Sequence, residues 1–139
     1  MATGYFNLII AWVWFCTGLT SGAVQGLFFH DEHWLGGYAS WRRRLTRLGH
    51  ISFLGTGLLN AMWAVSLWMN QADDWTAQLA SVLLIVGAVA MPAVCYLAAW
   101  KKPLRHLFFI PVASLIIGVV LATWVVYAHR LVSLDWRIS

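Results

Sequence analysis

The chain alternates between long apolar segments and short polar ones. The apolar segments cover residues 6–29, 48–69, 79–100 and 107–128, and each has 22 to 24 residues. About 20 helical residues are enough to cross the ~30 Å hydrocarbon core of a bilayer. Backbone groups in lipid must be hydrogen-bonded within the segment, so each segment is expected to be a helix. The pattern predicts an all-α integral membrane protein, a single four-transmembrane-helix up-down bundle over residues 1–139.

The polar connections agree with this division. The stretches "NQADDW" at 70–75 and "WKKPLRH" at 100–106 indicate short turns, and Pro103 suits the first turn of a helix. The connection before the second apolar segment is longer. There, Gly36 and Gly37 interrupt helical structure, and Ser40 is a suitable N-cap for a helix that begins near Trp41. The second helix is therefore expected to begin about two turns before the bilayer.

Composition supports a membrane location. Hydrophobic residues make up 61% of the chain and charged residues only 10%, whereas soluble domains have about 25% charged residues. Ten tryptophans favour the boundary between membrane and water. The net charge of +4 does not indicate a nucleic-acid partner, because seven of the nine Lys and Arg lie in just two short segments, 42–47 and 101–105.

Those two basic segments predict the orientation. The positive-inside rule places loops 30–47 and 101–106 in the cytoplasm and both termini outside, and we expect the membrane to be a bacterial inner membrane. The leading "MATGYFN" has no basic residue, and the apolar run after it is too long for a signal peptide, so it is expected to remain as a helix. Cys16 and Cys95 lie at different depths, which argues against a disulfide.

Small and polar residues within the segments suggest how the helices pack. Gly18, Gly22 and Gly26 lie on one helical face and would allow a partner helix to approach closely. Pro92 and Pro111 each remove a backbone donor, and each is expected to kink its helix. Three polar side chains inside the spans would serve either as interhelical hydrogen-bond partners or in ligand and proton handling; these are Gln25, Asn60 and Ser114.

Two histidines occupy matching positions. His50 in "LGHISFL" (48–54) opens the second apolar segment, and His106 in "LRHLFFI" (104–110) opens the fourth. In an up-down bundle, helices two and four face each other across the core, so both imidazoles would lie at one depth. They are candidate axial ligands of a haem b, with Arg47 and Arg105 as partners of its propionates. The alternative is that these are ordinary residues of the membrane boundary.

Other side chains offer weaker possibilities. The stretch "HDEHW" at 30–34 places His30 and His33 three residues apart, which permits a copper or zinc site, but a solvated loop explains it equally well. In "WRRRLTR", three consecutive arginines are candidates for binding anionic lipid headgroups; these are Arg42, Arg43 and Arg44.

No phosphate-binding loop or nucleophile motif is present, so catalysis by this chain alone is not expected. The sequence favours a small subunit of a respiratory or photosynthetic electron-transport complex, with haem b or quinol at its cytoplasmic side. Its partners would be membrane lipids and other membrane subunits, with no nucleic acid. The general plan is similar to that of membrane cytochromes b, at the level of architecture only. One alternative is a structural, lipid-organising subunit without a cofactor. Another is a small transporter lined by Gln25 and Asn60, which would lack the intramembrane charge expected of one.

Overall fold

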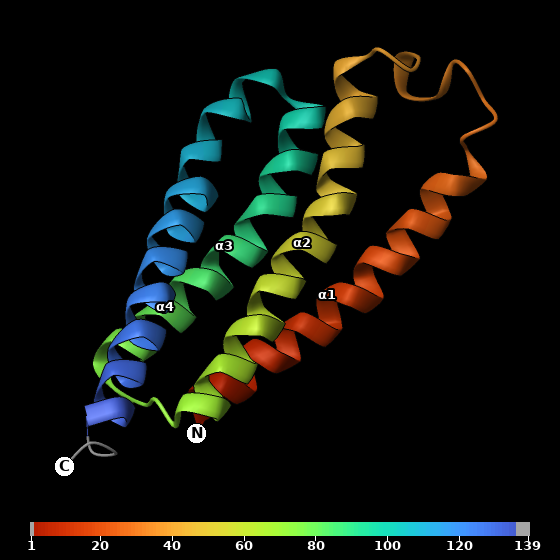
Figure 1. Ribbon diagram of the computed structural model, residues 1–139. Helices are drawn as coiled ribbons and strands as arrows, with labels where there is room; N and C mark the ends of the chain where they lie inside the picture. Colours follow the sequence, from red (N-terminus) through yellow and green to blue (C-terminus); the bar gives the residue numbers. More distant parts are fainter. Residues whose placement is uncertain (1, 136–139) are drawn as a thin grey trace.

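The computed structural model describes residues 2–135, and over this range it is all-helical, with no strand (Figure 1). Met1 and residues 136–139, which include Arg137 and Ser139, lie outside the described residues. Four long helices follow one another along the chain, and each is long and apolar enough to cross a membrane. Two short 3₁₀ helices lie in the connections. The elements are α1 (Ala2–Leu27), η1 (Trp34–Gly36), α2 (Trp41–Asn70), α3 (Trp75–Trp100), η2 (Lys102–Phe108) and α4 (Phe109–Asp135).

The connection before α2 follows the prediction from sequence. The Ser40 side chain caps α2 by accepting a hydrogen bond from the backbone N–H of Arg43 at 3.2 Å. Ahead of this cap, Gly36 and Gly37 have φ angles of 87° and 89°, a backbone conformation that residues other than glycine rarely adopt. The early start of α2 at Trp41 is thus confirmed, and its cause is local.

The prolines have different effects. Pro111 lies in the first turn of α4, where its missing N–H has no acceptor within α4 to lose, so a proline at this place does not by itself require a kink. Pro92 lies deep inside α3 and leaves the carbonyl of Ala88 without its normal partner four residues later. The indole N–H of Trp14, on α1, donates to that carbonyl at 2.9 Å. The backbone carbonyl that Pro92 leaves unpaired in α3 is thus hydrogen-bonded by α1, and this bond links the two helices.

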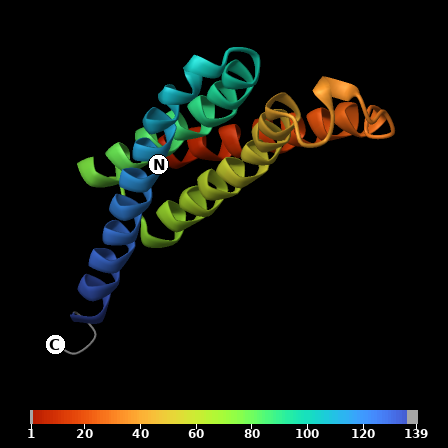
Figure 2. The same cartoon turned by 90° about the horizontal axis from the view of Figure 1, so that it is seen from above.

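The helices form a row in chain order. α1 packs extensively on α2, α2 on α3, and α3 on α4, whereas α2 and α4 touch only slightly. α1 and α4 make no direct contact within residues 2–135, and seen from above their ribbons run in different directions (Figure 2). The expectation that the second and fourth helices face each other holds only near the termini end, where Trp63 of α2 and Val125 of α4 belong to one buried cluster. It fails for His106, because η2 contacts α3 and α4 but not α2 within residues 2–135.

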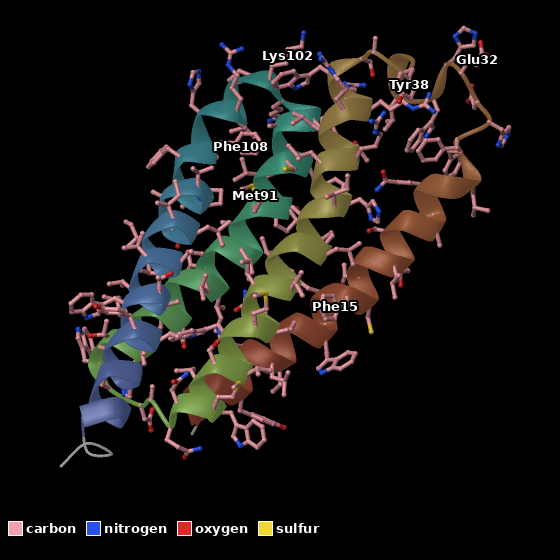
Figure 3. All side chains as sticks on the ribbon, viewed as in Figure 1. Phe15, Glu32, Tyr38, Met91, Lys102 and Phe108 are labelled. Carbon is pink, nitrogen blue, oxygen red and sulfur yellow. The ribbon has the colours of Figure 1, made fainter. Side chains whose placement is uncertain are left out.

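Two ends of the molecule are distinguished below. The basic end is formed by residues 28–47 and 101–108, and it includes Glu32, Tyr38 and Lys102 (Figure 3). The termini end is formed by the start of α1, the turn between α2 and α3, and the last described turns of α4 (Figure 1). Each end has its own cluster of buried apolar side chains. Trp63, Leu67 and Leu84 belong to the cluster near the termini end, and Leu45, Ala98 and Ala99 to that near the basic end.

Candidate functional site

The contact between α1 and α2, called here the α1–α2 seam, is close over most of its length and opens toward the basic end (Figure 1). A Cβ atom added at Gly18 would lie 2.8 Å from Leu54 Cδ2, and one added at Gly22 would lie 2.6 Å from His50 Cε1. At Gly26, one turn further, an added Cβ would meet nothing within 4 Å. The predicted small-residue face is confirmed at Gly18 and Gly22, whereas Gly26 borders open space.

His50 lies where the seam ends. Its imidazole is half-buried against the backbone of α1 at Gly22, and its Nδ1 is 3.2 Å from the Ser21 hydroxyl oxygen. Its other ring nitrogen, Nε2, has no hydrogen-bond partner among residues 2–135. Because the missing side chain of Gly22 makes room for the ring and Ser21 fixes one nitrogen, the imidazole is oriented with its second nitrogen unused.

Gln25 is the second polar group at this place. It lies four residues after Ser21, and therefore on the same face of α1. Its side chain is only 6% exposed, yet its Oε1 has no hydrogen-bond partner in the described part of the chain. A buried amide without a partner costs free energy, on the order of 1–3 kcal/mol, so its presence calls for an explanation.

α3 closes the back of the seam. The ring of Tyr96 packs on Gly49 of α2, where an added Cβ would lie 3.0 Å from Tyr96 Cε2. The Ser21 hydroxyl donates to the Gly18 carbonyl at 3.1 Å and lies 3.2 Å from His50 Nδ1. Ser21 therefore links α1 to α2, and Tyr96 of α3 packs behind α2 at Gly49.

The arginines at the basic end are directed elsewhere. Arg43 is 2% exposed, and its guanidinium donates to the backbone carbonyls of Asp31 and Phe29. It also lies over three aromatic rings, at 5.4 to 5.5 Å from their centroids, in cation–π geometry; these belong to Phe29, Trp34 and Tyr38. Arg47 lies over the Tyr38 ring at 4.9 Å. The guanidinium groups of Arg43 and Arg47 therefore both contact residues of the 28–38 loop.

The haem ligands expected from the sequence are not brought together. His50 is turned toward α1, whereas His106 is exposed in η2, which contacts only α3 and α4. Arg105 is also exposed, and Arg47 is held on Tyr38. Haem ligation by the pair stays a prediction, and this arrangement does not supply the facing geometry on which it was based.

The remaining candidates divide by exposure. His30 and His33 are exposed, and no group of three or more metal-ligating side chains occurs within the part of the chain that the structure describes. Arg42 and Arg44 are exposed at the basic end, but Arg43 between them is turned inward. Of the three arginines, only the two exposed ones are positioned to meet lipid headgroups.

A polar network that the sequence reading missed holds the termini half of the seam. Asn7 donates from Nδ2 to Asn60 Oδ1 at 2.7 Å, and Asn60 in turn donates to the carbonyls of Thr56 and Leu84. Both asparagines are fully buried. The Ser81 hydroxyl of α3 accepts from the Trp63 indole nearby. Asn60 is therefore enclosed by hydrogen bonds rather than lining a path.

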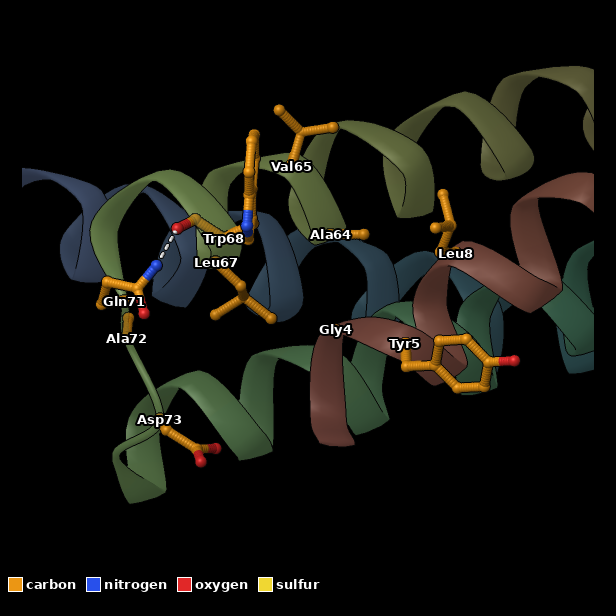
Figure 4. Close-up of a pocket in the computed structure, with 10 residues that line it drawn as sticks. All are labelled: Gly4, Tyr5, Leu8, Ala64, Val65, Leu67, Trp68, Gln71, Ala72 and Asp73. Carbon is orange, nitrogen blue, oxygen red and sulfur yellow. Dashed lines mark hydrogen bonds between the residues drawn. The ribbon is translucent and has the colours of Figure 1, made fainter. Parts of the chain in front are cut away.

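A groove at the termini end has a different character. It has a volume of about 550 Å³ and lies between the start of α1 and the end of α2, with mostly apolar walls (Figure 4). The amide at its rim, Gln71, donates to the backbone carbonyl of Trp68 at 2.7 Å. The amide of Gln71 is thus held by the backbone of its own helix, and the groove differs from the surroundings of His50 and Gln25 chiefly in its apolar walls.

Comparison with models of known protein families, with curated proteins and with solved structures found no match. The class of protein that the described residues define is an all-helical bundle with four helices able to span a membrane.

Proposed function

We propose that this protein is a small subunit of a membrane electron-transport complex, and that its chemical contribution is a histidine contact to a redox group through His50. The observation that carries the proposal is the state of the imidazole. One nitrogen is fixed by Ser21, the ring rests on Gly22, and Nε2 has no partner in the described chain. A histidine oriented through one nitrogen is a common way to present the other to a ligand.

The composition of the four spans supports a subunit rather than a transporter or pump. Four spans take up most of the 139 residues, and no carboxylate lies within the apolar segments defined from the sequence. Transporters and pumps usually require an intramembrane charge, and the polar Asn60 is already enclosed by hydrogen bonds. An accessory role in a larger assembly fits these properties.

The proposal includes an orientation. Both basic loops would face the cytoplasm of a bacterial inner membrane, with both termini outside, so His50 would lie in the cytoplasmic half. A reporter fused after Ser139 should be active on the outer side. Activity in the cytoplasm would move His50 to the opposite half of the membrane.

The test is purification of the tagged chain from its native membranes together with its partners. We expect redox-active subunits to co-purify, and we expect His50→Leu to lower quinol-driven electron flux in membranes while His106→Leu leaves it unchanged. If both substitutions abolish a low-spin Soret band, the two histidines share a haem. If the chain purifies without redox partners and its deletion leaves electron flux intact, the proposal fails.

A lipid-organising role is a second candidate, favoured by one observation. Arg42 and Arg44 are exposed, whereas Arg43 between them is turned inward. Each basic side chain near an anionic surface contributes ~1 kcal/mol to binding. Replacing both by Gln should lower binding to vesicles rich in anionic lipid without altering electron flux. An effect on flux alone would argue against this role.

A further inference from the structure

We infer that the groove at the termini end binds a phospholipid whose headgroup carries an ammonium group, with the start of an acyl chain along the apolar walls. This inference goes beyond the proposed function and does not depend on it, because the groove lies at the other end of the α1–α2 seam from His50. It is carried by the space, by the order of the polar and apolar walls, and by their charge.

The space lies between the first turns of α1 and the last turns of α2. Its volume of about 550 Å³ is within the usual range of small-molecule sites. Leu67 and Ala72, which line it, are buried, whereas Leu8 and Val65, which also line it, are 38% and 49% exposed. The groove is therefore open along the surface that α1 and α2 would present to lipid, and a ligand does not have to pass between the helices.

The walls change from polar to apolar along the groove. Gln71 and Asp73 lie at one end, in the turn that follows α2, and Leu8 lies at the other (Figure 4). From Gln71 back to Ala64 the groove follows α2 over about 10 Å. In a chain that spans a membrane, this turn lies at the boundary with water, and the apolar end points toward the hydrocarbon core. This order matches an amphiphile that lies parallel to the helices.

The charge of the polar end favours a cationic headgroup. Among the described residues that line the groove, Asp73 alone is charged, and none is Lys or Arg. Gln71 adds an amide oxygen, which is a second acceptor. Asp73 takes part in other interactions, but an ionised carboxylate has about four acceptor sites, so a headgroup can share it. A bare phosphate would be repelled at this place, whereas an ammonium group would be attracted.

Two exposed aromatic side chains belong to the same groove. Tyr5 and Trp68 line it and are 64% and 74% exposed. Tyr and Trp are typical of the membrane boundary, and the faces of their rings attract cations. At the basic end, by contrast, the exposed Arg42 and Arg44 favour anionic lipid. The two ends of the molecule would therefore select lipids with different headgroup charges.

The experiment uses the full-length chain in nanodiscs of phosphatidylglycerol that contain a small share of phosphatidylethanolamine with a photoreactive diazirine near the start of one acyl chain. After illumination, we expect label on peptides that cover residues 2–8 and 64–73. Added phosphatidylethanolamine without the diazirine should remove this label. Added phosphatidylglycerol should not remove it, because that lipid lacks the ammonium group.

Two variants test the walls and the charge separately. Val65→Trp places a large ring in the groove without altering Asp73, so it should abolish the competed label. Val82→Trp is the matched control, since Val82 is 55% exposed on α3 and does not line the groove, and it should change nothing. Asp73→Asn keeps the shape of the side chain and removes its charge. It should lower the preference for phosphatidylethanolamine over phosphatidylglycerol by about 1.5- to 5-fold, the loss typical of an exposed ion pair.

The inference is overturned if label is spread evenly over the lipid-facing surface, or if phosphatidylglycerol competes as well as phosphatidylethanolamine does. Equal labelling of Val65→Trp and Val82→Trp would also overturn it, as would crosslinks that place a second copy of the chain in the groove. An unchanged preference in Asp73→Asn would overturn the choice of an ammonium headgroup. If Asp73→Asn misfolds, headgroup competition in the unmodified chain and the pair of tryptophan variants still decide the result.

Discussion

At the termini half of the α1–α2 seam, the buried amide of Asn7 donates to Asn60; at the basic end of the same seam, the buried amide of Gln25 has an oxygen with no partner in the described chain. In the first pair, Asn60 also donates to one backbone carbonyl of α2 and one of α3. Asn7 Oδ1 is still unpaired there, so the enclosure is incomplete by one acceptor. The second place borders open space at Gly26.

The difference separates a buried polar residue that joins two helices from one whose side chain makes no hydrogen bond in the described chain. Both kinds are buried, and both come from α1. What distinguishes them is whether the facing helix supplies a complementary polar atom at the same level. Asn60 faces Asn7, whereas at the level of Gln25 the neighbouring arginines are already engaged by the loop.

The largest effect on the free energy of unfolding is expected from Gly22→Leu, because Gly22 lies in the seam between the two regions. The new Cβ would lie 2.6 Å from His50 Cε1, so either the imidazole or α1 must move. Overpacking of this kind costs about 1–3 kcal/mol in the free energy of unfolding, measured by denaturant titration in detergent. Gly26→Leu should stay within about 0.5 kcal/mol, because nothing lies within 4 Å of the added Cβ. Equal losses in both variants would show that α1 packs along its whole length.

The next effect concerns the closed half. In a double-mutant cycle of Asn7→Ala and Asn60→Ala, we expect a coupling energy of ~0.6–2 kcal/mol, the range of interhelical hydrogen bonds in membranes. The same cycle with Gln25→Ala in place of Asn7→Ala should give no coupling to Asn60. Coupling in both cycles would mean that the two ends of the seam respond as one unit.

Trp14 lies between the two regions, and its indole N–H donates to the Ala88 carbonyl, which Pro92 leaves without a partner in α3. Trp14→Phe should cost about 1 kcal/mol through the lost hydrogen bond. In a Pro92→Ala background the Ala88 carbonyl regains an acceptable N–H partner within α3, so the same substitution should cost less. An unchanged cost in that background would show that ring packing, not the hydrogen bond, links α1 to α3.

The smallest effect is expected from Gln25→Met. Removing a buried, unpaired amide should leave the free energy of unfolding unchanged or raise it by up to about 1 kcal/mol. Asn60→Met should be destabilising, because it leaves Asn7 without its acceptor. If Gln25→Met destabilises the protein as much as Asn60→Met does, Gln25 has a structural role and the comparison between the two ends no longer holds.

The helices themselves could be predicted well from the sequence, because each depends on local signals. Ser40 and the Gly36–Gly37 pair predicted the start of α2, and the apolar lengths predicted four elements able to span a membrane. The arrangement of those helices could not be predicted in the same way. A core shared by all four helices was assumed, but α1 and α4 make no contact within residues 2–135 and α2 meets α4 only slightly, and this depends on contacts distributed over long surfaces.

The candidate site was predicted in part. His50, Gln25 and Arg47 were each singled out, but the choice of His106 as the partner of His50 rested on the assumed arrangement. Ser21 was missed because a serine in an apolar helix usually bonds its own backbone. One signal was available and unused: Pro92 frees the Ala88 carbonyl, so a donor from another helix was required there.

The link between Trp14 and Ala88 also bears on how the chain is assembled during synthesis. The two residues are 74 positions apart, so at about 5–20 residues per second the indole of α1 is made roughly 4 to 15 s before its acceptor. Asn7 likewise waits for Asn60. In a chain that inserts as it is made, α1 would enter the membrane with polar groups whose partners do not yet exist. Those groups would have to stay near water or another protein until α2 and α3 are made.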